Sequence, residues 1–542
     1  MKHPVNKKQI KVLLEMRPAL EGFAGIPQEC RLLFRGLRML DDVDAEGMIQ
    51  TSQRTLARGT PIRTKRFKKV TAAKRLNRYS RVIVSLAEKP YRTLIDEVYS
   101  YIEKRLAATS LSLRSLAGGG RIKLTQFESH NFTDFTWRTL FAKTLPASDF
   151  DLVSSADHRI CSVPWHTMHM AGLKSMSVSP NPQYPRLATE GVDVFIAQTP
   201  YPASIDRKTA FVVRYHDAIP VLMPHTIPDK SLHQATHFYA LSSNVKSGAY
   251  FACVSESTRQ DLLRMFPEVA DRAVTIYNMV SHHYFKEAAQ AQRVPDIIRG
   301  RLYESDAVKG VELRPKFFSL REQEGFYRRV LNEKPLKYLL IVSTVEPRKN
   351  HTRLLAAWEV LKAEVDPDIK LVVVGTIGWD YMSIVKGFRS WIDRGELFML
   401  NAVPAPDLRV LYRNAAATVC PSLGEGFDFS GVEAMRSDGV VIASDIPVHR
   451  EVYEDAAEYF DPYSTATLVK ALKNVLYASD AEQRQARLRE RGHAVSERYL
   501  PENVLPKWQQ FIENVASKPR PALTDANALP TPNQVRGAVD VR

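Results

Sequence analysis

The sequence predicts an α/β protein with two domains, each built on a doubly wound parallel sheet. Its 542 residues exceed what a single small hydrophobic core holds together, which indicates at least two domains. Between residues 337 and 500, short apolar runs alternate with longer stretches of helical periodicity. Strands that alternate with helices are typical of βαβ units and therefore of a parallel sheet.

The second half of the chain shows this alternation most regularly. Its apolar runs predict buried strands, and its amphipathic stretches predict helices. The predicted strands are residues 338–344, 370–375, 397–401, 417–422 and 439–444, and the predicted helices are residues 350–364, 404–415 and 464–478. Asn350 stands at the start of the first of these helices, where it is a favourable N-cap.

The first half repeats the pattern with insertions. Its predicted strands are residues 10–16, 193–198, 210–216, 249–255 and 274–278, and a helix is predicted at 257–266. We therefore divide the chain into an N-terminal domain, residues 1–315, and a C-terminal domain, residues 316–502. The N-terminal domain holds a basic insertion at about residues 50–125, and the Pro- and Ala-rich tail, residues 517–542, is predicted to be disordered.

The composition is that of a soluble globular protein, with 44% apolar and 25% charged residues. No apolar run reaches the length that a membrane span requires, and the N-terminus lacks the pattern of a signal peptide. The four cysteines lie far apart without a CxxC pair, which argues against a disulfide framework or a zinc site. These features predict a cytoplasmic protein.

The formal net charge of +15 is concentrated in one block. Residues 54–81 hold eleven Lys and Arg side chains and no acidic residue. Such a block fits anionic lipid headgroups, nucleic acid or a phosphorylated acceptor, and a plain solvated insertion is equally compatible with it.

Candidate binding residues follow the predicted strands of the second half. Ligands of doubly wound sheets bind at the carboxyl ends of the strands. Arg348 and Lys349 stand there, directly before the helix that starts near Asn350. Two cations beside a helix N-terminus suit a phosphate group, although such a pair is also common as surface charge.

A second candidate loop, "PSLGEGFDFSGVEAM", follows the strand at 417–422. Gly424 and Gly426 permit close approach of the backbone to a ligand, and the carboxylates of Glu425 and Glu433 accept hydrogen bonds from sugar hydroxyls. Glu433 also has a purely local interpretation, because "SGVE" is a capping box with Ser430 as N-cap.

The first half offers weaker candidates. His216 and Asp217 end the strand at 210–216, where an imidazole can donate to a substrate or simply stabilise a turn. Gly22 and Gly25 follow the first strand and let a loop approach a ligand at a helix start.

These motifs together resemble one family. The stretch from Glu425 to Pro462, "EGFDFSGVEAMRSDGVVIASDIPVHREVYEDAAEYFDP", is similar to the nucleotide-binding signature of family 4 glycosyltransferases of the GT-B fold. "STVEPRKNHTRLLAAW" looks like the diphosphate loop of that family, and "YHDAIP" looks like its His-Asp loop. The resemblance covers residues 193–285 and 337–462 and is thin over residues 31–190.

The resemblance implies a GT-B architecture, in which two Rossmann-like domains face each other across a cleft. It implies retaining, metal-independent transfer of a sugar from a nucleotide-sugar donor, without a cofactor. Arg348 and Lys349 would contact the donor diphosphate, Glu425 the donor sugar and Glu433 the ribose. The remaining residues implied in the site are His216 beside the reacting sugar, Gly25 near the donor phosphates, and Gly426, Phe427, Asp428 and Phe429 in the donor loop.

Two further implications concern the ends and the partners of the molecule. A helix at residues 503–516 would cross back to the N-terminal domain. The similarity to mannosyl-adding branches makes GDP-mannose the first donor to test, with a lipid-linked or polysaccharide acceptor of the O-antigen type. The basic block 54–81 would dock the enzyme on the anionic inner face of a membrane.

The chain departs from the usual family wording in the donor loop. The common form is "EGFGLP", whereas this chain has "EGFDFS", with Asp428 in place of a glycine. We hypothesise that Asp428 binds a hydroxyl of the donor sugar. The alternatives to a transferase are a sugar-nucleotide hydrolase or epimerase on the same fold, and a basic nucleic-acid-binding protein, which the scarcity of aromatic residues in the block disfavours.

Overall fold

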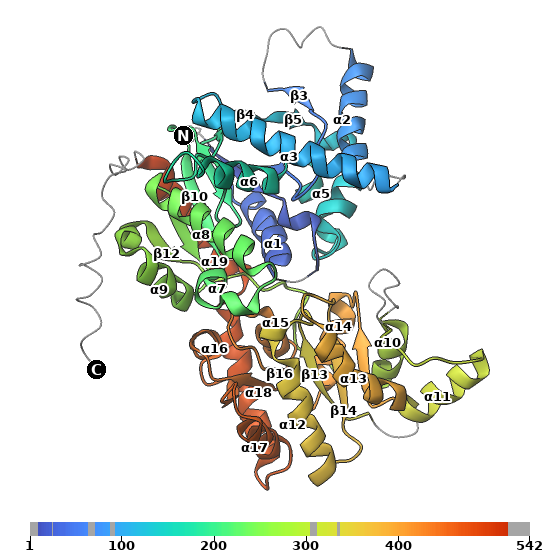
Figure 1. The fold of residues 1–542 in the computed structure, drawn as a ribbon. Helices are drawn as coiled ribbons and strands as arrows, with labels where there is room; N and C mark the ends of the chain where they lie inside the picture. Colours follow the sequence, from blue (N-terminus) through green and yellow to red (C-terminus); the bar gives the residue numbers. More distant parts are fainter. Residues whose placement is uncertain are drawn as a thin grey trace, which may run out of the picture.

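The computed structural model describes residues 9–518 apart from residue 24 and residues 63–70, 87–92, 304–311 and 333–335. Within this part of the chain, the strands form sheets of nine, six and three strands. The nine-stranded sheet belongs to the N-terminal domain and the six-stranded sheet to the C-terminal domain, and the two domains lie one above the other in Figure 1.

The N-terminal sheet has the strand order β12-β11-β10-β8-β1-β2-β6-β5-β3. Its pairs are parallel from β12 to β6, and β5 and β3 add an antiparallel edge. The strands are β1 Ile10–Glu15, β2 Val43–Ile49, β3 Thr60–Pro61, β5 Thr125–Phe127, β6 His158–Ile160, β8 Val194–Ala197, β10 Ala210–Tyr215, β11 Tyr250–Cys253 and β12 Ala273–Thr275. The three-stranded sheet comprises β4 Arg121–Lys123, β7 Arg186–Ala188 and β9 Ser204–Ile205.

The C-terminal sheet is parallel throughout, in the order β15-β14-β13-β16-β17-β18. Its strands are β13 Tyr338–Val342, β14 Lys370–Val374, β15 Leu397–Leu400, β16 Ala417–Cys420, β17 Val441–Ser444 and β18 Ala457–Phe460. The order reverses between β13 and β16, so the loops that follow these two strands flank the switch point where doubly wound sheets bind ligands.

Helices cover both sheets. In the N-terminal domain they are α1 Ile26–Arg38, α2 Ala72–Leu86, α3 Leu94–Leu116, α4 Thr133–Thr136, α5 Phe150–Ser154, α6 Trp165–Ser175, α7 Ile219–Leu222, α8 Lys230–Lys246 and α9 Glu256–Met265. Those that follow are α10 Val294–Gly300, α11 Leu320–Asn332, α12 His351–Glu364, α13 Met382–Arg394, α14 Ala405–Asn414, α15 Phe429–Arg436, α16 Pro447–Tyr453, α17 Thr465–Leu476, α18 Ala481–Glu497 and α19 Pro501–Ser517. The expected α/β class with two doubly wound parallel sheets is confirmed.

The last helix, α19, leaves the C-terminal domain and packs into the N-terminal core (Figure 1). Its buried side chains, among them Trp508 and Ile512, share one apolar cluster with β1 and α1. The predicted tail lies almost wholly outside the described residues, because α19 ends at Ser517 and residues 519–542 are not described.

The boundary between the two domains stays a prediction. In the structure, α10 lies beside α14, and Leu302 forms a bridge with Leu400 of β15.

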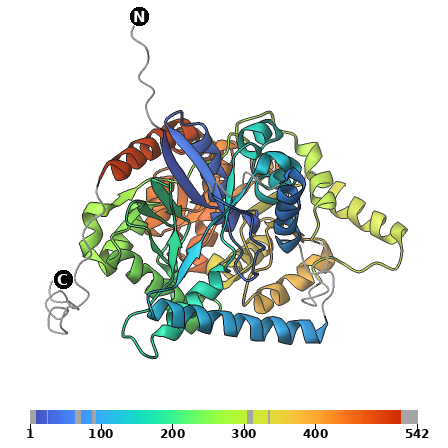
Figure 2. The same ribbon diagram turned by 90° about the horizontal axis from the view of Figure 1, so that it is seen from above.

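The basic insertion contributes α2 and the long helix α3, which is seen at full length in Figure 2. Residues 63–70, which hold five cations of the basic block, lie outside the described residues.

Candidate active site

The loop after β13 presents Arg348 and Lys349 in a short 3-10 turn just ahead of α12. Asn350 precedes the first residue of α12, as predicted, but it adopts a left-handed conformation (φ 58°) and does not cap the helix with its side chain. Its amide instead donates to the carbonyls of Pro421 and Pro462 at 3.0 and 2.9 Å. Asn350 therefore ties this loop to the loop after β16.

The loop after β16 places Glu425 between the two cations. Lys349 Nζ lies 2.5 Å from Glu425 Oε1, and Arg348 Nη1 lies 2.9 Å from Oε2. Arg348 also donates to the carbonyl of Gly424 and to the buried carboxylate of Glu346. Burial raises the pKa of Glu425, but the charges of Arg348 and Lys349 outweigh it and hold that pKa below its usual value. Glu425 is therefore an ionised carboxylate that orients two cations.

Asp428 is the N-cap of α15, and the predicted capping box is wrong. Asp428 has a φ of 63°, and its Oδ1 accepts from the backbone N–H of Ser430 and from its hydroxyl, at 3.2 and 2.6 Å. The helix consequently begins at Phe429, so Ser430 lies inside it and Glu433 falls in the second turn. Asp tolerates this left-handed backbone better than most residues.

The second oxygen of Asp428 faces a buried imidazole. Oδ2 lies 3.2 Å from His449 Nε2, and the His449 side chain is fully buried. Burial works against ionisation of Asp428, but its bonds with His449 and the nearby Lys349 charge hold its pKa well below the usual range. Both carboxylate oxygens thus have partners inside the protein, and the expectation that Asp428 binds a sugar hydroxyl stays a prediction.

Glu433 is buried and hydrogen-bonded across the two domains. Its Oε1 accepts from Gln28 Nε2 of α1 at 2.7 Å, and its Oε2 accepts from the hydroxyl of Tyr412 at 3.1 Å. Burial raises the pKa of Glu433 to about 7, although the hydrogen bonds from Gln28, Tyr412 and Tyr284 oppose the rise. Glu433 is therefore poised to change its charge near neutral pH.

The N-terminal domain contributes His216 and Asp217 after β10. His216 Nε2 lies 3.3 Å from Gln198 Oε1, and burial together with the Arg214 cation holds the pKa of His216 well below its usual value. Its imidazole is therefore neutral. Asp217 accepts from the N–H of Ile219 at 3.0 Å and so fixes the turn that leads into α7.

The two domains touch through backbone at Gly426. A Cβ atom at Gly426 would lie 1.8 Å from the carbonyl oxygen of His216, so no other residue fits without a shift. Thr258 of α9 donates to the carbonyl of Gly426 at 3.4 Å from the same side. The glycine is needed because the donor loop lies directly on the His-Asp loop.

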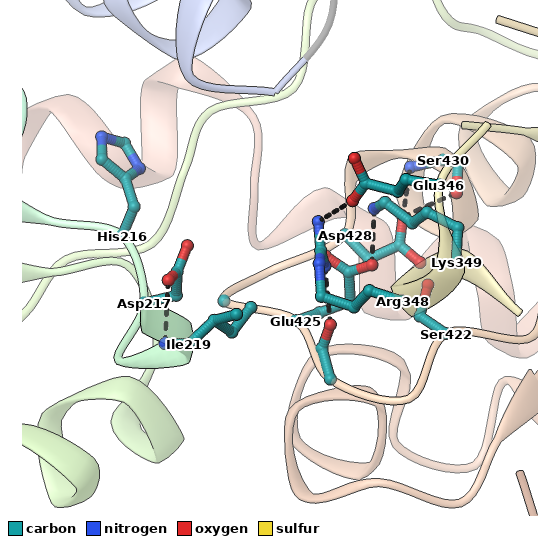
Figure 3. Close-up of polar contacts among 12 residues, drawn as sticks. His216, Asp217, Ile219, Glu346, Arg348, Lys349, Ser422, Glu425, Asp428 and Ser430 are labelled. Carbon is teal, nitrogen blue, oxygen red and sulfur yellow. Dashed lines mark hydrogen bonds and ion pairs between the residues drawn. The ribbon is translucent and has the colours of Figure 1, made fainter. Parts of the chain in front are cut away.

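A cavity of about 690 Å³ is lined by these loops from both domains. In Figure 3, His216 and Asp217 face the cluster of Arg348, Lys349 and Glu425 from the opposite domain. The structure brings together every residue that the sequence predicts for the site: Gly25, His216, Arg348, Lys349, Glu425, Gly426, Phe427, Asp428, Phe429 and Glu433. Gly25 precedes α1 with a φ of 68°, and the ring centroids of Phe427 and Phe429 lie 5.3 Å apart at the C-terminal wall. The roles of these residues stay predictions.

Several cavity residues were missed by the sequence interpretation, notably Gln28, Lys143, Thr344 and Trp379. Gln28 could have been predicted from the sequence, because it stands in the first turn of the helix that begins after Gly25. Thr344 lies in the quoted diphosphate loop, but no role was assigned to it. Trp379 and Lys143 follow no recognisable motif, and Lys143 comes from the insertion-rich region where the resemblance is thin.

Within the described residues, no group of three or more His, Cys, Asp or Glu side chains is arranged so that it could hold a metal ion. Likewise, no helix in the described part of the chain is long and apolar enough to cross a bilayer. The expectation of metal-independent transfer stays a prediction.

Comparison with known proteins identifies the C-terminal half. Residues 323–494 match the family model "Glycosyl transferases group 1". The chain is 34% identical over 148 residues to the serotype-specific mannosyltransferase WbdA of Escherichia coli, which covers 27% of this chain and 18% of WbdA. It is 28% identical over 262 residues to the O-antigen chain mannosyltransferase B of Escherichia coli, covering 46% of this chain and 57% of that relative. A third relative, the O-antigen chain mannosyltransferase RfbU of Salmonella typhimurium, is 25% identical over 280 residues, covering 50% of this chain and 65% of RfbU.

The matches thus span less than two thirds of each of these relatives. Among solved structures, sucrose-phosphate synthase from Thermosynechococcus elongatus has a TM-score of 0.53 at 12% identity, covering 94% of this chain and 99% of that chain. This likeness confirms the GT-B architecture. The chain therefore carries a group 1 glycosyltransferase domain over residues 323–494 and is related to the O-antigen mannosyltransferases of enteric bacteria.

Proposed function

We propose that the protein is a retaining glycosyltransferase that moves a sugar from a nucleotide-sugar donor to a lipid-linked or polysaccharide acceptor. The observation that carries the proposal is the cavity between the domains, where two cations, two differently charged carboxylates and a neutral imidazole converge. The group 1 glycosyltransferase domain supplies one wall of that cavity.

Arg348 and Lys349 are assigned to the donor diphosphate. Glu425 holds both cations at the cavity wall, and an ammonium with three N–H donors retains further donors beyond its bond to Glu425. Glu433 is assigned to the ribose, whose hydroxyls would donate to its carboxylate. Glu425 is assigned to hydroxyls of the donor sugar, because the loop that carries it directly contacts the His216 loop.

The bond changes require charge stabilisation at the diphosphate. The bond between the anomeric carbon and the phosphate oxygen breaks, and a bond from the acceptor hydroxyl oxygen forms on the same face of the sugar. The hydroxyl proton passes to the departing phosphate oxygen, so a nucleoside diphosphate is released. Fixed cations aimed at the oxygen that gains negative charge lower this barrier without a metal ion.

His216 is assigned to the reacting sugar. A neutral imidazole both donates and accepts a hydrogen bond, and Gln198 already fixes one ring nitrogen at 3.3 Å. An uncharged ring also avoids electrostatic repulsion with the positive charge that builds up on the sugar in the transition state.

GDP-mannose is the first donor to test, because the relatives named above are mannosyltransferases. Purified protein is incubated with GDP-mannose, UDP-glucose and a lipid-linked oligosaccharide acceptor, with and without EDTA. We expect a glycosylated acceptor with the anomeric configuration of the donor by NMR, and EDTA should leave the rate unchanged.

Lys349→Ala should reduce the turnover at least a hundredfold, because one donor of the electrostatic site is lost. Lys473→Ala is the matched control, since that lysine pairs with Glu364 on the surface at 2.7 Å. Free sugar or an epimerised donor formed without an acceptor would establish the hydrolase or epimerase instead. Salt-sensitive binding to duplex DNA without any nucleotide-sugar binding would overturn both enzyme proposals.

The proposed setting is the cytoplasmic face of a membrane. The described part of the basic block includes α2, whose cations Lys74, Arg75 and Arg81 are exposed. Each cation near an anionic surface contributes about 1 kcal/mol to binding. Replacing these three by Gln should weaken sedimentation with phosphatidylglycerol vesicles, and replacing the exposed Lys386, Lys470 and Arg487 of the C-terminal domain should not. Equal sedimentation of both triple variants would refute the docking role.

A further inference from the structure

One hydrogen bond links the two domains inside the cavity. Gln28 of α1 donates from Nε2 to Glu433 Oε1 at 2.7 Å, although the residues are 405 positions apart in the chain. Gln28 is 6% exposed and Glu433 is 4% exposed, so the bond is shielded from water. A hydrogen bond to a buried carboxylate is among the stronger kinds in proteins.

The carboxylate of Glu433 is oriented from several sides. The Tyr412 hydroxyl donates to its second oxygen at 3.1 Å, and Tyr284 adds a further hydrogen bond. A carboxylate offers about four lone-pair positions, so these protein donors leave acceptor capacity for hydroxyls in the cavity. Tyr412 lies on α14, and Tyr284 packs into the same apolar cluster as Tyr412, whereas Gln28 comes from the first turn of α1.

Other hydrogen bonds also hold the domains together. Glu451 of α16 accepts from the backbone N–H groups of Glu256 and Ser257 at the start of α9, at 2.6 and 2.8 Å. Trp379 donates to the carbonyl of Thr226 at 2.9 Å on another side of the interface. With these contacts in place, the bond from Gln28 acts on the carboxylate itself.

We propose that Gln28 is a positioning residue, which fixes the Glu433 carboxylate for the ribose hydroxyls of the nucleotide. Ribose recognition then depends on the position of the N-terminal domain, because the donor of this bond belongs to α1. The inference rests on the proposed function, in which Glu433 binds the ribose.

The chemistry of Glu433 supports the assignment. Burial raises its pKa, and the hydrogen bond from Gln28 is the largest influence that opposes the rise. Without Gln28 the carboxyl group is more often protonated and turns more freely, and a neutral carboxyl is a weaker acceptor for hydroxyls.

The test measures the ribose preference by calorimetry. GDP, UDP and ADP, with the 2′,3′-dideoxy form of each, are titrated into the full chain. The parent protein should bind at least one ribonucleotide more tightly than its dideoxy form. Gln28→Met keeps the size of the side chain but lacks the hydrogen-bond donor. It should lower the ratio of the dissociation constant of the dideoxy form to that of the ribonucleotide about tenfold. In Gln28→Asn the side chain is shorter by one methylene, so its amide no longer reaches Glu433, and the ratio should fall as well. This variant replaces Gln28→Met if the latter fails to fold.

Two further variants separate positioning from general loosening. Glu433→Gln should abolish the preference, and adding Gln28→Met to it should change the ratio no further. Glu451→Gln weakens the domain interface away from the cavity and should reduce the affinity for both forms equally, with the ratio preserved. A Gln28→Met protein with the parent ratio would overturn the inference. If no ribonucleotide binds to the parent, the proposed function itself fails.

Discussion

At the scale of single residues, the two glutamates of the donor loop have opposite electrostatic settings. Glu425 is paired with two cations, which keep its pKa low, whereas burial raises the pKa of Glu433 to about 7. In the unfolded chain both titrate near 4.5. The two residues therefore affect stability in opposite directions as the pH changes.

We predict that Glu433 makes the protein less stable as pH rises from about 4.5 to about 7. The folded state binds the proton more tightly than the unfolded state, so this stabilisation is complete below the unfolded pKa and is lost as pH rises through the folded pKa. Glu433→Gln should gain stability relative to the parent between pH 5 and pH 8 in thermal unfolding. The exposed Glu190→Gln serves as control. Parallel pH curves for Glu433→Gln and the parent would contradict the prediction.

Gly426 is a second residue with a specific requirement. Gly426→Ala should destabilise the protein by about 1–3 kcal/mol, because its Cβ would meet the His216 carbonyl oxygen at 1.8 Å. Gly325→Ala, in the interior of α11 with open space around its Cβ position, should instead stabilise by about 0.5–1 kcal/mol. Denaturant unfolding measures both values, and similar shifts for the two variants would argue against the close approach.

At the scale of elements, α15 depends on its N-cap. Asp428 caps the helix and also pairs with the buried His449 at 3.2 Å. We expect Asp428→Ala to cost about 3 kcal/mol of unfolding free energy, because it removes the cap and leaves Nε2 of the buried His449 without its partner. Ser464→Ala at the half-buried N-cap of α17 should cost only about 1 kcal/mol. Equal losses in urea titrations would show that the His449 pair contributes nothing.

At the scale of the whole molecule, α19 ties the end of the C-terminal domain to the core of the N-terminal domain. Trp508 is fully buried there, and the Arg214 guanidinium lies 5.1 Å from its ring centroid. Trp508→Ala should cost about 3–5 kcal/mol, which is typical of a buried aromatic side chain.

A chain that ends after Lys518 should keep the parent melting temperature, because residues 519–542 are predicted to be disordered. Loss of stability in that shortened chain would refute the predicted tail.

The fold class and most of the donor loops could be predicted from the amino-acid sequence alone. Buried strands such as β13 and β14 are continuous apolar runs, and their short length and β-branched residues identify them as strands. The chemistry of Arg348, Lys349 and Glu425 was also visible, because the residues that follow parallel strands gather at one edge of the sheet. The strand β2 was missed because Asp44 and Glu46 interrupt it, and both are paired with distant cations, Lys11 and Arg159.

How these parts act on one another depends on contacts between segments that are distant in the sequence. The capping-box interpretation placed the N-cap of α15 at Ser430, but the left-handed Asp428, held by His449, caps the helix two residues earlier. The hydrogen bond between Gln28 and Glu433 joins residues 405 positions apart, and no local sequence pattern predicts it. Local periodicity encodes the elements, whereas burial and contacts between domains set the orientation and charge of Glu433, and those arise only when the chain is folded.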